Sequence, residues 1–141
     1  MSGVDPSATA IFGAQVSEPE IERVALSAVA QQAVDALPPG SALLVVRRGP
    51  NAGARFLLDH DDTTAGRSTK SDIFLDDVTV SRRHAIFTRE DGLWVVRDAG
   101  SLNGTYVNRE RTDHALLQAG DEVQIGKFRM TFHPSQAGNS Q

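Results

Sequence analysis

The sequence of 141 residues contains no cysteine. That absence excludes a disulfide scaffold, a thiol nucleophile and a zinc site built on cysteine. No apolar run approaches the roughly 20 residues that a helix needs to cross a bilayer. The first residues also lack the basic start and apolar stretch of a signal peptide. We therefore expect a cytoplasmic protein with no membrane association, and the length suits one compact domain with a tail.

Excess charge of either sign is absent from most of the chain. Lys and Arg number 14 and Asp and Glu number 18, so the formal net charge is −4. Residues 1–39 hold five acidic residues against Arg23 alone, whereas residues 40–141 hold 13 of each sign. The acidic segment is either a solubilising tail or a ligand for the rest of the chain or for a partner. A neutral body with few aromatic residues argues against nucleic-acid binding.

Residues 1–39 are predicted to form a flexible regulatory tail. The first residues are mostly small and polar, and such a composition cannot build a core. Ser17 followed by Glu20 fits the capping-box pattern of a helix start. Apolar residues then recur at helical spacing as far as Leu37, where a Pro-Pro-Gly triplet follows. We expect a short Ala-rich helix within residues 18–37 that is marginal in isolation.

From Ser41 onward the pattern is typical of β-structure. Short apolar runs, such as residues 43–46 and 94–96, are separated by turn-forming Gly, Pro, Asn and Asp residues. No segment has sustained helical periodicity. Many short strands at close spacing predict an all-β sandwich. We place this domain at residues 40–133 and expect a disordered C-terminal tail at residues 134–141.

Three loop motifs lie between the predicted strands. They are Gly66-Arg67, Ser81-Arg82-Arg83-His84 and Ser101-Leu102-Asn103-Gly104-Thr105. Each is weak alone, because Gly-Arg and Asn-Gly are common turn dipeptides. In this order and spacing, on a background of short strands, they resemble the forkhead-associated (FHA) domain. The resemblance covers residues 41–133 and implies a phosphothreonine-binding β-sandwich of about eleven short strands.

The residue types in these motifs suit a phosphothreonine, which brings three acceptor oxygens and about −1.5 to −2 charges. Arg67 can hold two phosphate oxygens at once, Ser81 offers a hydroxyl donor and Arg82 a second cation. Asn103 carries both an amide donor and a carbonyl acceptor, which suit a peptide main chain. The FHA resemblance implies phosphate contacts for Arg67 and Ser81 and a main-chain contact for Asn103. Arg82 fits a second phosphate contact.

Other residues of the motifs are predicted to have secondary or structural roles. Arg83 binds either phosphate or the residue three positions after the phosphothreonine, and Ser101 and Leu102 are weaker ligand candidates. His84 could in isolation be a metal ligand or a general base. No acid or second His lies at ligand spacing, however, and the resemblance implies a buried brace between loops. The other expected structural residues are Gly66, Gly104 and Thr105.

No pattern in the sequence indicates catalysis, a metal ion or a cofactor. Asp59-His60-Asp61-Asp62 lacks the Gly and the distant Glu of a calcium loop. The Gly-rich stretch 49–53 lacks the Gly-Lys-Ser/Thr ending of a phosphate-cradling loop. There is no Gly-x-Ser-x-Gly elbow. We therefore expect a binding protein and not an enzyme.

Longer stretches resemble one actinobacterial family of FHA proteins, the GarA/OdhI regulators of 2-oxoglutarate metabolism. These stretches are residues 39–46, 48–53, 55–59, 71–84 and 100–110. The resemblance implies that the unphosphorylated protein inhibits the E1 component of 2-oxoglutarate dehydrogenase, or glutamate-metabolising enzymes. It also implies that a serine/threonine protein kinase modifies the N-terminal tail. The phosphothreonine then binds the protein's own FHA site and blocks the target surface.

The phosphorylation segment of that family is partly changed here. The family carries Glu-Thr-Thr-Ser-Val-Phe-Arg-Ala, whereas this chain has Ser-Ala-Thr-Ala-Ile-Phe-Gly-Ala at residues 7–14. One threonine remains, Thr9, and it is our candidate for phosphorylation. Ile11 and Phe12 follow it and suit a groove beside the phosphate. The alternatives are that Thr9 is an ordinary tail residue, and that the protein is an adaptor that binds a phosphorylated partner in trans with no metabolic target.

Overall fold

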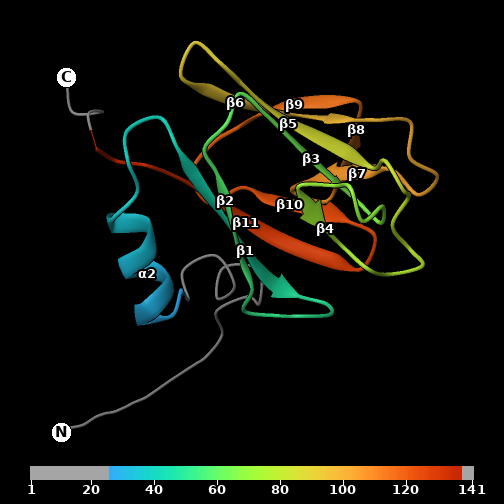
Figure 1. The fold of residues 1–141 in the computed structure, drawn as a ribbon, viewed down its shortest axis with the longest axis horizontal. Helices are drawn as coiled ribbons and strands as arrows, with labels where there is room; N and C mark the ends of the chain where they lie inside the picture. The colour runs from blue at the N-terminus through green and yellow to red at the C-terminus, as the bar shows by residue number, and fades with distance from the viewer. Residues whose placement is uncertain (1–25, 138–141) are drawn as a thin grey trace, which may run out of the picture.

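The computed structural model describes residues 26–137, which form one short helix and eleven strands (Figure 1). The helix is α2 (Ala28–Asp35). The strands are β1 (Ala42–Arg48), β2 (Arg55–Leu58), β3 (Asp62–Gly66), β4 (Ile73–Phe74), β5 (Ala85–Glu90), β6 (Leu93–Asp98), β7 (Thr105–Val107), β8 (Glu110–Thr112), β9 (His114–Leu117), β10 (Glu122–Ile125) and β11 (Phe128–Pro134).

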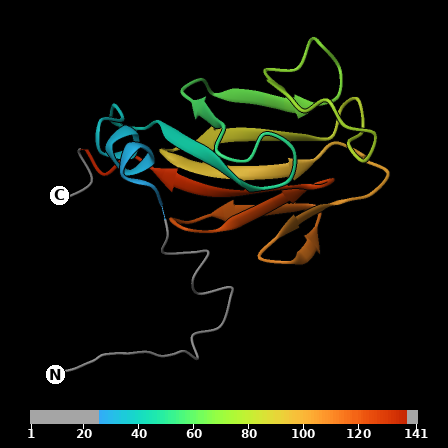
Figure 2. The same cartoon turned by 90° about the horizontal axis from the view of Figure 1, so that it is seen from below.

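The strands form two sheets that pack face to face. One sheet has six strands in the order β2-β1-β11-β10-β7-β8, and the other has five in the order β4-β3-β5-β6-β9. The paired strands are antiparallel except for β3 with β4, which run parallel. Figures 1 and 2 show α2 at one end of the sandwich and the loops around β4 at the other. The predicted all-β sandwich is confirmed.

The core lies between the two sheets and follows from the alternation of side chains along each strand. In β1, Leu44 and Val46 face the other sheet, so Leu43 and Val45 face outward. The largest fully buried side chains include Phe87 of β5 and Phe128 and Phe132 of β11. Burying an aromatic side chain of this size contributes about 1.5–3 kcal/mol.

The described helix begins after Ser27. The Ser27 hydroxyl accepts the N–H of Ala30 at 3.1 Å, which satisfies one of the unpaired donors of the first turn. The helix ends at Asp35, two residues before Leu37. The start predicted at Ser17 lies outside the described residues. No helix within residues 26–137 is long and apolar enough to span a bilayer.

α2 covers the outer face of β1. Val34 and Leu37 pack against Leu43 and Val45, the two outward apolar residues of that strand, and form a second buried cluster. The Ser135 hydroxyl, beyond β11, donates to the carbonyl of Leu37 at 3.0 Å. The run of apolar residues in β1 is therefore buried on both faces, because the helix covers the side that would otherwise meet water.

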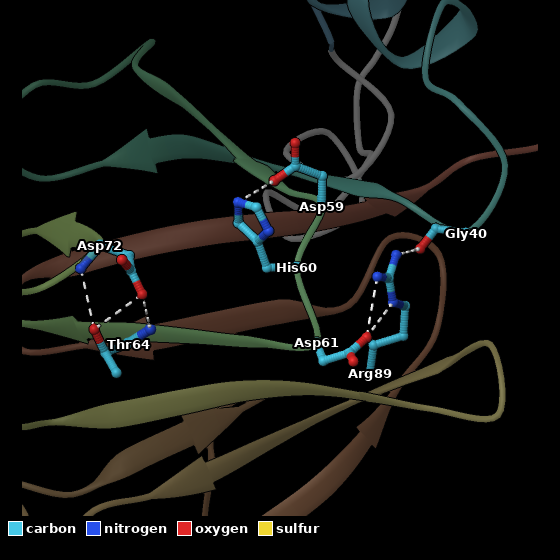
Figure 3. A network of polar contacts seen from close by, with 7 residues as sticks. All are labelled: Gly40, Asp59, His60, Asp61, Thr64, Asp72 and Arg89. Carbon is cyan, nitrogen blue, oxygen red and sulfur yellow. Dashed lines mark hydrogen bonds and ion pairs between the residues drawn. The ribbon is translucent and has the colours of Figure 1, made fainter.

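Arg89 of β5 joins the segment after α2 to the sandwich (Figure 3). Its guanidinium donates to the carbonyl of Gly40 at 3.0 Å and to the carboxylate of Asp61 at 3.1 and 3.3 Å. The guanidinium carbon also lies 5.5 Å from the centroid of the Trp94 ring, within cation–π range. These contacts fix the place where the N-terminal segment enters the domain.

The metal-like sequence at residues 59–62 forms a solvent-exposed turn. His60 Nε2 lies 3.5 Å from the Asp59 carboxylate, and its side chain is 83% exposed (Figure 3). Within residues 26–137 no three His, Asp or Glu side chains are grouped so that they could hold a metal ion.

Truncating the core residue Phe87 tests this architecture. Phe87→Ala leaves a cavity between the sheets, and we expect the free energy of unfolding to fall by about 3–5 kcal/mol. Leu93→Ala is the control, because Leu93 is 55% exposed on β6 and its truncation should cost within about 0.5 kcal/mol. Urea unfolding measures both, and equal losses would contradict the assigned core.

Candidate functional site

The three sequence motifs meet at the end of the sandwich that lies opposite α2 (Figure 1). The first follows β3, the second precedes β5 and the third leads into β7. The N–H of Arg67 donates to the carbonyl of Ser81 at 2.9 Å, and the N–H of Ser68 donates to the carbonyl of Arg82 at 3.2 Å. The first two loops are therefore hydrogen-bonded directly to each other.

Gly66 allows this close approach between the loops. A Cβ atom at this position would lie 2.0 Å from the carbonyl oxygen of Arg82 and 2.8 Å from the carbonyl carbon. Real Cβ atoms do not approach main-chain atoms so closely, so any side chain would push the two loops apart. Gly104 has a different constraint, since its φ of +89° lies in the left-handed region that favours glycine.

Arg67 is half-buried and its orientation is fixed. Its Nε donates to the carbonyl of Val80 at 3.0 Å. A guanidinium has five N–H donors in a rigid plane. A bond from Nε holds that plane and leaves the terminal nitrogens able to bind two oxygens of one anion.

Ser81 and His84 connect the second loop to the third. The Ser81 hydroxyl accepts the N–H of Leu102 at 3.0 Å. The buried ring of His84 accepts the N–H of Ser81 at Nδ1, 3.1 Å away, while Nε2 lies 2.8 Å from the carbonyl of Gly104. A carbonyl only accepts, so Nε2 carries the hydrogen and Nδ1 is the acceptor. One neutral imidazole therefore ties two loops together.

Asn103 is exposed and lies across from a residue that the sequence did not single out, Thr79. The Asn103 amide donates to the carbonyl of Thr79 at 2.9 Å. The N–H and hydroxyl of Thr79 both donate to Asp77, and its hydroxyl accepts the N–H of Lys127 at 3.0 Å. Two hydrogen bonds to the Asp77 carboxylate hold the pKa of Asp77 below its ordinary value. The bond from the Thr79 hydroxyl has the larger effect, and the bond from the Thr79 N–H has the smaller one. Nothing in the sequence marks this long-range contact.

The carboxylate of Asp98 forms hydrogen bonds with several groups of the third loop. One carboxylate oxygen accepts the N–H groups of Gly100 and Ser101 at 3.0 Å, and the other accepts the hydroxyls of Ser101 and Thr105. The Ser101 hydroxyl also accepts the N–H of Gly104. Burial by itself would raise the pKa of Asp98, but these hydrogen bonds outweigh it and lower the pKa from 3.8. The hydroxyls of Ser101 and Thr105 are thus both used inside the loop.

The remaining predicted residues lie on the surface around this platform. Arg82 and Arg83 are exposed, and the side chain of Leu102 is 84% exposed. Arg83 also borders a pocket of about 230 Å³. Sequence reasoning did not select the other polar residues that line this pocket, which are Thr64 on β3 and, shortly after Arg67, Ser68, Lys70 and Ser71.

The three loops thus present cationic, hydroxyl and amide groups at one end of the domain, on main chain that is braced by buried hydrogen bonds. Residues 63–126 match the family model of the FHA domain. Among solved structures, EmbR of Mycobacterium tuberculosis in complex with a low-affinity phosphopeptide is 32% identical, with a TM-score of 0.62. The likeness covers 67% of this chain and 24% of EmbR.

The relatives define the family further. The oxoglutarate dehydrogenase inhibitor of Corynebacterium efficiens is 68% identical over 106 residues, 75% of each chain. The glycogen accumulation regulator GarA of Mycobacterium tuberculosis is 62% identical over 125 residues, 88% of this chain and 77% of GarA. The chain belongs to this FHA-domain family of oxoglutarate dehydrogenase inhibitors and GarA regulators.

The role of Asp98 can be tested by its effect on stability against pH. Its lowered pKa in the fold means that it stabilises the protein above its ordinary pKa of 3.8. This contribution disappears as the pH falls through the lower folded value. Asp98→Asn should lose about 1–3 kcal/mol at pH 7 because four donors of the third loop, three of them in part-buried bonds, lose a charged acceptor. Its unfolding free energy should also fall less steeply below pH 4 than that of the parent, and parallel curves would refute the assignment.

Proposed function

We propose that this chain is a phosphothreonine-binding regulatory protein of the cytoplasm that acts by binding and not by catalysis. The observation that carries the proposal is the convergence of Arg67, Ser81 and Asn103 from three separate loops. Arg67 supplies a fixed cationic fork, Ser81 a hydroxyl and Asn103 a main-chain partner, with Arg82 as a further cation at the edge. A phosphate monoester on a peptide matches this set of donors.

The target that the relatives support is an enzyme of 2-oxoglutarate or glutamate metabolism. Curated relatives from Corynebacterium carry the name oxoglutarate dehydrogenase inhibitor. The unphosphorylated chain accordingly binds and inhibits the E1 component of 2-oxoglutarate dehydrogenase, or a glutamate-metabolising enzyme, through the face formed by the three loops.

Phosphorylation of the chain's own N-terminal segment switches this inhibition off. A serine/threonine protein kinase modifies Thr9, and the phosphate binds at Arg67 and Ser81 of the same molecule. About 17 residues separate Thr9 from Leu26, which span up to about 55 Å when extended. A strand of seven residues is only about 23 Å long, so Thr9 can reach the loops from the end that carries α2.

Binding in trans is the second candidate function. The solved EmbR complex contains a phosphopeptide, which shows that a related FHA protein takes a ligand of this chemistry. In this alternative the chain is an adaptor for a phosphorylated kinase or another signalling protein, and it has no metabolic target.

The phosphate site is tested with a peptide that contains phospho-Thr9 and spans residues 4–15. Arg67→Ala removes a charge-assisted contact worth about 2–5 kcal/mol, so the dissociation constant measured by calorimetry should rise at least thirty-fold. Arg55→Ala is the matched control, because it removes an exposed arginine from β2, an edge strand of the six-stranded sheet. Equal affinity for the phosphorylated and unmodified peptides would contradict the proposed site.

The switch is tested on 2-oxoglutarate dehydrogenase activity with the full chain. The unphosphorylated chain should inhibit, and phosphorylation at Thr9 should relieve the inhibition. Phosphorylation should relieve inhibition by Arg67→Ala much less than inhibition by the parent, each compared with its own unphosphorylated form, because the phosphate in the variant has no guanidinium to bind. Thr9→Ala, treated with kinase, controls for modification elsewhere. Absence of inhibition together with tight binding of the phosphopeptide would favour the adaptor.

A further inference from the structure

The pocket of about 230 Å³ that Arg83 borders lies on the outer face of the five-stranded sheet. Its lining includes Thr64 of β3 and Ile86 of β5, which are paired across the two strands. Both side chains point outward, because the residues that alternate with them, Ala65 and Ala85, are buried in the core. The loops that follow β3 and precede β5 complete the lining. We refer to this pocket as the flanking pocket.

The flanking pocket and Asn103 lie on different sides of the candidate phosphate site. Arg83 borders this pocket, whereas Thr79 and Asn103 border a separate hollow of about 480 Å³. Ser81, the proposed phosphate ligand, lies between Thr79 and Arg83 in the second loop. Ser68, which directly follows the proposed guanidinium fork, also lines the flanking pocket. A peptide that is anchored by its phosphate therefore has this pocket beside a neighbouring residue.

Two cationic side chains line the flanking pocket. Lys70 and Arg83 are both exposed. In the part of the chain that the structure describes, no ion pair and no side-chain hydrogen bond involves either of them. Residues 66–72 and 81–84 together contain four basic residues against one acidic residue, Asp72. The local charge therefore favours an anion in this pocket.

The carboxylate of Asp72 is engaged by β3 and does not neutralise either cation by direct contact. It accepts the N–H of Thr64 at 2.9 Å and the hydroxyl of Thr64 at 3.2 Å (Figure 3). The same hydroxyl accepts the N–H of Asp72 at 3.0 Å. The carboxylate would have to give up the bonds that it accepts from Thr64 in order to pair with Lys70.

Hydrogen bonds fix the main chain that carries the two cations. The N–H of Ser71 donates to the carbonyl of Ser68 at 3.0 Å, and the N–H of Lys70 donates to the Ser68 hydroxyl at 3.1 Å. These bonds close a tight turn around Lys70. Arg83 directly precedes the buried His84. The pocket is thus formed before a ligand arrives, and only the ends of two long side chains have to be ordered on binding.

We propose that the flanking pocket binds a second anionic side chain of a phosphothreonine ligand, which is either a carboxylate or another phosphate. Lys70 and Arg83 bind the anion, and Ile86 contacts its aliphatic stem. This inference rests on the proposed function, because the phosphothreonine at Arg67 anchors the ligand. It adds a preference that the phosphate site alone does not impose, namely an acidic or phosphorylated residue near the phosphothreonine.

Calorimetry with the full chain and a set of synthetic peptides tests the preference. Each peptide has one phosphothreonine in a background of Ala and Gln, with a single Glu at one of the four positions on either side. The matched peptide has Gln at that position. On one side of the phosphothreonine, Glu should lower the dissociation constant at least threefold, since each exposed ion pair contributes up to about fivefold. Phosphoserine at the same position carries more charge and should lower it further.

Variants of the chain locate the effect. The ratio of the Glu and Gln affinities is measured within each variant, so that a change in binding of the phosphothreonine itself cancels. Lys70→Gln and Arg83→Gln should each reduce this ratio, and the double variant should abolish it. Arg55→Gln is the matched control, because it removes an exposed arginine of β2, and it should keep the ratio of the parent. In nitrogen-15 spectra, the Glu and Gln peptides should give different shifts at Ile86 but not at Gly126, which lines the other hollow.

Three outcomes would contradict the inference, and they are distinguishable. Equal affinities for Glu and Gln peptides at every position, in a chain that still prefers the phosphorylated peptide, refute the anion site and leave the phosphate site standing. No preference for the phosphorylated over the unmodified peptide refutes the phosphate site and this inference with it. Tighter binding of Leu than of Glu at the responsive position would show that the pocket takes an apolar side chain, which also overturns the proposal.

Discussion

The buried His84 is the residue on which the arrangement of the three loops depends. Its ring nitrogens form hydrogen bonds with the N–H of Ser81 and the carbonyl of Gly104. Its backbone N–H donates to the carbonyl of Ala65 at 3.0 Å, and its backbone carbonyl accepts the N–H of Ala99 at 2.9 Å. Four separate points of the chain are thus fixed by one side chain and its own peptide groups. In a dry interior each of these bonds is costly to lose, because its partner would remain unsatisfied.

The loops that form the site therefore have little conformational freedom. Gly66 lets the first two loops touch, Asp98 holds the third loop, and the Nε bond of Arg67 orients the guanidinium. Donors that are held in place lose little conformational entropy when an anion arrives. Long side chains on the surface, such as Arg82 and Arg83, add charge but have to be ordered on binding.

The sequence predicted the sandwich because turn residues and short apolar runs are local signals. It also placed the three motifs in order. It could not reveal that Asn103 donates to Thr79, 24 residues away, or that α2 buries the outer side of Leu43 and Val45. Those contacts depend on strand order and on helix docking. A continuous apolar run such as residues 43–46 shows that a strand is buried but not what covers its second face.

The bonds from Arg89 to Gly40 and from Ser135 to Leu37 also shorten a linker. With α2 bound to β1, the attachment point of Thr9 is Leu26 and not Ala42, so the separation falls from about 33 to about 17 residues. The effective concentration of a ligand on a flexible linker falls roughly as the −3/2 power of linker length. If Thr9 binds in cis as proposed, docking of this two-turn helix raises the effective concentration of Thr9 at the phosphate site roughly threefold. A phosphopeptide in solution that competes for the same site has to exceed that higher effective concentration.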